Sequence, residues 1–291
     1  MRADEPRSLD EYRSLFRRTV TLGRRWTDFA DLVTLTSQVN ISLRGIHEVA
    51  GKNPEFAARV LRMARSAAYG AGHAKTLAHA MAFIGIPAVM SILLSLAIHG
   101  MTVIREGADG FDGRAFLRRC LALGFLCKAM AYRTQSVEPE AAYLMGLLQD
   151  CGYLALTHFA WSQFRDLTSA VKAAPGEQLI VIERECLGYD HAQIGGVLAE
   201  EWKFDPVLRS AISFHHAPAE APAEHRHAAD LGHMSSCVCD DIGFPPFPGA
   251  QRNAADPLSF ERSGIDPAYV IRLTDSIREQ ASQAEVSLYA A

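Results

Sequence analysis

An aspartate and several histidines in the second half of the chain are the residues whose types could do chemistry. Asp150 ends the segment AAYLMGLLQD, where a helix is expected to stop and a side chain can turn inward. His191 and His215 each share a helical face with apolar residues, so both imidazoles are expected to point into the interior. His216 and Asp230 follow close behind. Imidazole and carboxylate groups suit first-row divalent cations, so a helical bundle that gathers these side chains could hold a metal.

The same histidines also have a purely structural interpretation. A histidine on an apolar helix face is more often a hydrogen-bonded core residue than a metal ligand. Five of the 11 histidines lie between His215 and His233, and a solvated His-rich loop would give the same pattern. Spacing alone therefore favours structural histidines over a metal site.

Composition limits the class of protein that can position these groups. The 291 residues are 49% hydrophobic, which is enough for a large core without disulfides. Basic residues number 29 and acidic residues 33, for a formal charge of -4, so we expect no nucleic-acid partner. The amino terminus is charged from its second residue and lacks the apolar run of a signal peptide, which predicts a cytoplasmic protein. Its six scattered cysteines are expected to be free thiols.

One stretch, residues 76–104, contains no Asp, Glu, Lys or Arg and is long enough to span a bilayer. Gly85 and Pro87 interrupt it, and proline is best tolerated in the first turn of a helix. Two shorter helices that meet near Ile86 are therefore expected. Polar residues within the stretch and the absence of flanking basic clusters favour buried core helices, so no membrane span is predicted.

The elements that must position the site are almost all helices. Apolar residues recur three and four positions apart, and alternating β-type runs are missing, so the fold class is all α. Asn53 with Pro54 and Asp205 with Pro206 are cap-plus-proline signals for helix starts. An irregular loop is expected at 243–256, which contains GFPPFPG. The predicted helices are 7–20, 28–38, 53–65, 112–132, 138–159, 161–173, 177–186, 191–202, 206–216, 221–241 and 266–284.

Several stretches, taken in order, resemble HDOD domains, the output-domain relatives of HD-type metal-dependent phosphohydrolases. LRMARSAAYG resembles a helix-ending segment of that family, although Arg65 replaces the usual asparagine. AMAFIG resembles its Ala-Ile-x-x-Leu-Gly element, and YLMGLLQDCG resembles its Gly-Leu-Leu-His-Asp-Ile-Gly signature. GYDHAQIGGVLAEEW and AISFHHAP resemble its closing motifs. The resemblance implies a multi-helix HD-like bundle with an N-terminal helical lobe. It divides the chain into an N-terminal helical extension at 1–27, the HDOD-like domain at 28–220 and a C-terminal helical extension at 221–291 that packs on the domain.

Departures from the family pattern bear on catalysis. Active HD enzymes carry a His-Asp doublet, whereas this chain has Gln149 before Asp150. No histidine occurs between His99 and His158, so the ligand expected on the 112–132 helix is also missing. The residues that the resemblance still implies as metal ligands, vestigial or weak, are Asp150, His191, His215, His216 and, less firmly, Asp230. Glutamine is a poor ligand for a transition metal, so we expect no catalytic residue and no cofactor beyond a weakly held divalent metal.

The leading hypothesis is a non-catalytic regulatory module of bacterial signal transduction that acts through contacts with a signalling protein. One alternative is a divergent metal-dependent phosphohydrolase that uses the remnant site on a nucleotide or cyclic dinucleotide. Another is a nucleotide sensor in which Arg118, Arg119 and Lys128 meet phosphates. For Arg118 and Arg119, ordinary surface charges are the simpler interpretation.

Overall fold

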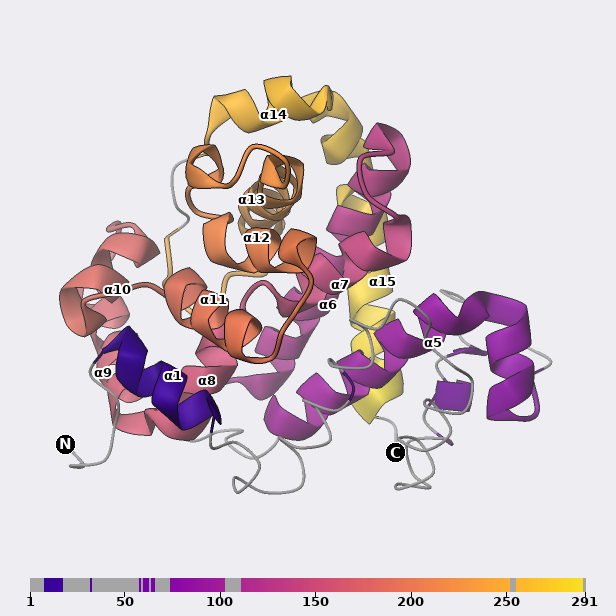
Figure 1. The fold of residues 1–291 in the computed structure, drawn as a ribbon, viewed down its shortest axis with the longest axis horizontal. Coiled ribbons are helices and arrows are strands. Elements are labelled where there is room, and N and C mark those ends of the chain that lie inside the picture. Colours follow the sequence, from indigo (N-terminus) through magenta and orange to yellow (C-terminus); the bar gives the residue numbers. More distant parts are fainter. Residues whose placement is uncertain are drawn as a thin grey trace.

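The protein is described by a computed structural model over residues 8–17, 32, 58, 60–62, 64–65, 74–102, 111–251 and 255–289. Within these ranges every regular element is a helix, loops join the helices, and an isolated bridge pairs Gln178 with Gln251, so the all-α prediction is confirmed (Figure 1). The predicted helices 28–38 and 53–65 lie mostly outside the described residues. The helices are α1 (Leu9–Arg17), α5 (Leu77–Thr102), α6 (Gly113–Thr134), α7 (Pro139–Leu148), α8 (Cys151–Phe159), α9 (Trp161–Ala173), α10 (Leu179–Leu187), α11 (His191–Glu201), α12 (Pro206–Phe214), the 3-10 turn η4 (Pro218–Glu220), α13 (Arg226–Asp241), α14 (Pro257–Ser263) and α15 (Pro267–Tyr289).

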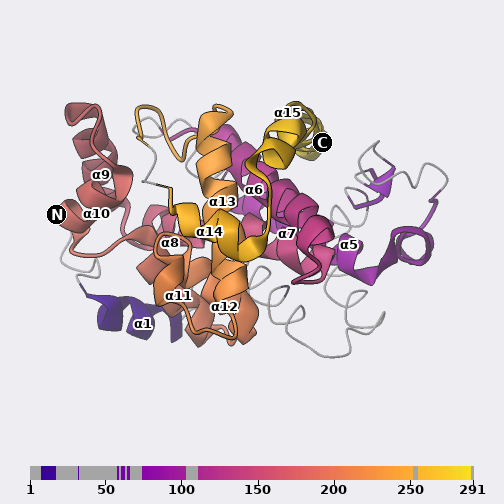
Figure 2. The same ribbon diagram turned by 90° about the horizontal axis from the view of Figure 1, so that it is seen from above.

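Helix α6 is the central element of the bundle. It begins after Asp112, whose side chain accepts a hydrogen bond from the Ala115 amide, and most of its residues are buried. Helices α5, α7, α13 and α15 all pack against it, and Figures 1 and 2 show α6 and α7 side by side in both views. The two helices can approach this closely because α7 carries Gly146, where a Cβ atom would lie 2.2 Å from the carbonyl oxygen of Leu123.

The charge-free stretch forms α5, which is broken where the sequence predicted. Gly85 has φ 83° and ψ 158°, which is not helical, and Pro87 lies in the first turn beyond it. By length and composition α5 could also cross a membrane, since Ala78–Thr102 has a mean hydropathy of 2.3. In this structure 67% of that window is buried, and core helices of soluble proteins meet the same criterion. The absence of a membrane span stays a prediction.

The second half of the chain departs from the predicted helix boundaries at four places, one of which is the end of α15 at Tyr289 instead of residue 284. The helix expected at 138–159 is two helices, because the chain turns at Gln149 and Asp150 between α7 and α8. The helix expected at 221–241 begins only at Arg226, after η4. Helix α14 was not predicted at all, although Asp256 caps it and Pro257 opens it.

Helix α1 packs on α11 and so belongs to the same folded unit as the site helices. Tyr12 and Phe16 are buried on its inner side. Arg13 pairs with Glu200 at 2.8 Å, and Arg17 pairs with Glu201 at 2.8 Å. Its amphipathic pattern is thus accounted for by contacts within the chain.

Candidate functional site

Asp150 lies at the break between α7 and α8 and is fully buried. Its position beside α11 depends on Gly152, because a Cβ atom there would lie 2.0 Å from the carbonyl oxygen of His191. On the other side, a Cβ on Gly195 of α11 would lie 3.2 Å from the sulfur of Cys151. The two glycines bring α8 and α11 into backbone contact, and this contact sets Asp150 next to His191.

His191 opens α11, where Asp190 and Gln193 form a capping box. Its Nδ1 lies 2.9 Å from both carboxylate oxygens of Glu183, and its backbone N–H donates to the same group at 3.0 Å. Glu183 is itself buried on α10 and accepts a hydrogen bond from the Tyr153 hydroxyl. The Tyr153 ring stacks on the imidazole with centroids 4.1 Å apart. These contacts leave the ring of His191 one orientation, with Nε2 directed away from Glu183.

Three imidazoles converge at that nitrogen. The Nε2 atom of His191 lies 3.2 Å from Nε2 of His215 and 3.1 Å from Nε2 of His216. Nδ1 of His215 is 2.9 Å from the carbonyl oxygen of Ile212, which assigns the proton to Nδ1 and leaves Nε2 as an acceptor. Oδ1 of Asp150 is 3.5 Å from Nε2 of His191 and 3.8 Å from Nε2 of His215. The structure therefore brings together four of the five residues that the sequence singled out.

Burial and the carboxylates of Glu183 and Asp150 together set the pKa values of the three histidines. Burial alone would lower the pKa of His191, but Glu183 and Asp150 outweigh it and raise that pKa to about 10. Burial and the neighbouring charge of His191 lower the pKa of His215 to about 4, and burial likewise lowers the pKa of His216. Without a metal, the arrangement is one imidazolium that faces two neutral imidazoles.

The residue that sequence reasoning misread is Arg119. It is only 2% exposed, so the prediction that it is a surface charge or a phosphate contact is wrong. The guanidinium donates to Oδ2 of Asp150 at 2.7 Å, to Oδ1 of Asp240 at 2.5 Å, to the carbonyl oxygen of Phe244 at 2.7 Å and to Ser236 at 3.0 Å. Burial would raise the pKa of Asp150, but Arg119 reverses this and holds it well below its usual range. The position of Arg119 three residues after Phe116, on the apolar face of its helix, was a signal of burial.

The remaining residues that the sequence suggested as phosphate contacts or metal ligands form ion pairs within the chain. Arg118 donates to Glu285 at 3.1 Å, and Lys128 pairs with Glu140. Asp230, predicted less firmly as a ligand, accepts hydrogen bonds from Arg262 at 2.5 Å and from Ser259 at 2.7 Å, both on α14. Its carboxylate thus serves to hold α14 against α13.

The side chains of this cluster meet some of the requirements for binding a metal ion and lack others. The nitrogens of His215 and His216 each lie about 3 Å from that of His191, and all three lie within 4.8 Å of one another, which suits one tetrahedral cation. Gln149, however, stands where the doublet requires histidine, and its buried side chain approaches Ser235 at 3.5 Å. Helix α6, on which active HD enzymes carry a further histidine, presents Arg119 to Asp150 instead. At these two positions the described residues differ from the ligand pattern that the resemblance implies for an active HD enzyme.

The model of the HDOD domain family matches residues 27–218. No curated protein matches the chain in sequence.

Solved structures share the fold at low sequence identity. An HDOD domain protein of unknown function from Geobacter sulfurreducens is 17% identical, with a TM-score of 0.77 over 96% of this chain and 99% of that one. A proposed phosphohydrolase from Shewanella amazonensis is 23% identical, with a TM-score of 0.71 over 94% and 98%. A proposed signal transduction protein from Marinobacter aquaeolei is 21% identical, with a TM-score of 0.75 over 93% of this chain and 60% of that one. With two thirds of its length matched by the family model and the fold shared throughout, this chain belongs to the HDOD family.

Proposed function

We propose that this protein is a non-catalytic, cytoplasmic regulatory module of bacterial signalling that acts through contacts with another protein. The observation that carries the proposal is the buried ion pair between Arg119 and Asp150. In HD enzymes the aspartate of the doublet binds a cation that activates water. Here a guanidinium is bound to that carboxylate, and it has neither an open coordination position nor the ability to lower the pKa of a water molecule as a metal does.

The same ion pair supports a role as a rigid scaffold. Arg119 ties α6 to the start of α8 through Asp150 and to α13 through Asp240 and Ser236. The buried guanidinium of Arg119 has four acceptors, and well-satisfied buried polar groups of this kind favour one arrangement of the surrounding helices. A module that presents a fixed surface to a partner needs such an arrangement, whereas it has no need of a water-filled catalytic cleft.

A hydrolysis assay tests the proposal. The untagged chain is incubated with Mn²⁺ and either bis(p-nitrophenyl) phosphate or a cyclic dinucleotide, beside an Asp150→Asn variant as the matched control. We expect release of product at the same background rate from both proteins, because no group in the cluster activates water. Metal-dependent turnover by the parent that the Asp150→Asn variant lacks would show that the protein is an enzyme.

A second candidate function is favoured by one feature, the convergence of three imidazole nitrogens. His191, His215 and His216 could bind one divalent cation, and this cluster would then serve as the site of a divergent phosphohydrolase or a nucleotide sensor. The sensor has less support than the sequence suggested, because Arg118, Arg119 and Lys128 are all engaged by carboxylates within the chain.

A further inference from the structure

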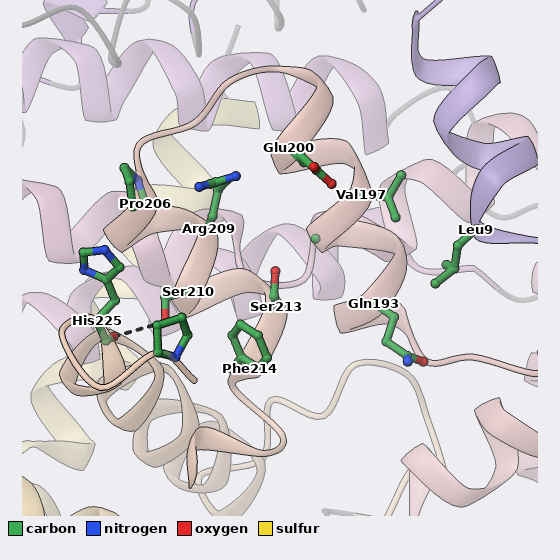
Figure 3. A pocket seen from close by; sticks show the side chains of 12 residues that line it. Leu9, Gln193, Val197, Glu200, Pro206, Arg209, Ser210, Ser213, Phe214 and His225 are labelled. Carbon is green, nitrogen blue, oxygen red and sulfur yellow. Dashed lines mark hydrogen bonds between the residues drawn. The ribbon is translucent and has the colours of Figure 1, made fainter. Parts of the chain in front are cut away.

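A cavity of about 490 Å³ lies between α1, α11 and α12, and no residue of the histidine cluster lines it. Most of its wall is apolar and comes from Leu9, Val197, Pro206, Phe214 and Pro222. Figure 3 shows the labelled side chains around a central space, with Leu9 and Val197 on one side and His225 on the other. The volume is within the range of sites that hold small organic molecules.

One charged side chain in this wall lacks a counter-ion. Arg209 lies on α12, and within the described part of the chain no carboxylate pairs with its guanidinium. Its Nε atom is buried and has no hydrogen-bond acceptor there. By contrast, Arg13 and Arg17 of α1 pair with Glu200 and Glu201 of α11. Because no carboxylate among the described residues neutralises this guanidinium, Arg209 is set up to receive an anion from outside the chain.

The neighbouring polar groups define the charge of that anion. Glu200 also lines the cavity, but its Oε2 accepts a hydrogen bond from Arg13 at 2.8 Å, so its charge is already balanced. Gln193 uses its side-chain oxygen to cap α11 by accepting from the Asp190 amide. Among the described residues of the cavity wall, Arg209 is thus the arginine without a carboxylate partner, and its single positive charge matches a monoanion better than a multiply charged phosphate.

Room for a polar contact exists in the middle of the wall. A Cβ atom on Gly196 would lie 2.5 Å from the hydroxyl oxygen of Ser213, so the missing side chain keeps that hydroxyl accessible from α11. Figure 3 places the Ser213 hydroxyl near the centre of the cavity, between Arg209 and Phe214. A ligand that lies on Phe214 can therefore reach both a hydroxyl and a guanidinium.

We propose that this cavity binds a small organic monoanion, a carboxylate with an apolar body, whose charged end is held by Arg209 in the planar, two-point manner of arginine. The apolar body lies against Phe214, Val197 and the start of α1. The ligand would contact α11 and α12 together, the two helices that position His191 and His215. Its binding would stabilise the packing of these helices and so supply the regulatory module with a chemical input.

Calorimetric titration of the full chain tests the proposal with three probes: 4-phenylbutyrate, its neutral analogue 4-phenylbutyramide, and AMP as a multiply charged phosphate. We expect saturable binding of 4-phenylbutyrate alone, with affinity reduced about tenfold or more in an Arg209→Gln variant, because a hydrogen bond to a charged group is lost. An Arg165→Gln variant is the matched control, since Arg165 is an exposed arginine of α9. It should bind as the parent does.

Three results would overturn the assignment: no saturable binding of 4-phenylbutyrate by the parent, equal affinity in the parent and the Arg209→Gln variant, or a preference for the amide or for AMP. Thermal unfolding of each variant without ligand supplies the folding control. Because Arg209 makes no ion pair among the described residues, its replacement should leave the melting temperature unchanged. A ligand-induced rise in melting temperature in the parent, absent from Arg209→Gln, would support the same conclusion independently.

Discussion

Replacement of Arg119 by methionine is expected to destabilise the protein by about 3–5 kcal/mol. The change removes the guanidinium that binds both Asp150 and Asp240, and Asp150 is left charged in a buried site whose nearest remaining basic contact is the longer one, 3.5 Å, to His191. Breaking a buried ion pair from one side is costly because the remaining charge keeps its desolvation penalty and loses its partner. Urea unfolding followed by circular dichroism measures the difference in the free energy of unfolding.

The neighbouring arginine supplies the control. Arg118 pairs with Glu285 but is about one third exposed, and Arg114 contacts the same carboxylate. An Arg118→Met change should therefore cost about 1 kcal/mol or less. Combining Arg119→Met with Asp150→Asn should recover part of the loss, because the unpaired charge is then removed. Equal effects of the two single arginine changes would mean that the Arg119 network contributes little to the fold.

Gly152→Ala is the second change with a large expected effect. The new methyl group would lie 2.0 Å from the carbonyl oxygen of His191, and it would meet backbone atoms that cannot rotate away. Helices α8 and α11 would have to separate, so we expect a loss of about 3 kcal/mol, at the upper end of the usual cost of overpacking. Urea unfolding measures the loss, and chemical shifts of the His191 imidazole report whether its contact with Asp150 is lost.

Gly100→Ala is the matched substitution. Gly100 also lies within a helix, but a Cβ atom there would meet nothing within 4 Å. Alanine lowers the conformational entropy of the unfolded chain relative to glycine, so this variant should be more stable than the parent by about 0.5–1 kcal/mol. If both glycine variants shifted stability in the same direction and by similar amounts, the close contact between α8 and α11 would be disproved.

Local signals in the sequence were sufficient for most helices. Asp205 with Pro206 predicted the start of α12, and the structure shows Asp205 accepting hydrogen bonds from the amides of Val207 and Leu208. The same signal was present at Asp256 and Pro257, where α14 begins, and it was overlooked beside the proline-rich loop. At Asp150 two expectations conflicted, because the residue was placed at a helix end while the apolar pattern continues through it from α7 into α8 and favoured one helix over 138–159.

The candidate site was only partly predictable because its chemistry depends on tertiary partners. The inward direction of His191 and His215 could be inferred from helical periodicity. The role of Arg119 could not, since it depends on Asp150 and Asp240, which are 31 and 121 residues away in the chain. Asp230 was misplaced for the same reason, because its partner Arg262 lies on the helix that the sequence did not predict.

Metal content, measured by inductively coupled plasma mass spectrometry on protein purified without an affinity tag or chelator, tests the central claim most directly. The comparison is a His191→Ala, Asp150→Ala double variant, which lacks the centre of the cluster. Because Arg119 already neutralises Asp150, the account predicts far less than one transition-metal ion per chain in the parent and no difference from the variant. About one ion per chain in the parent, absent from the variant, would contradict it and would identify the three imidazoles as a functioning metal site.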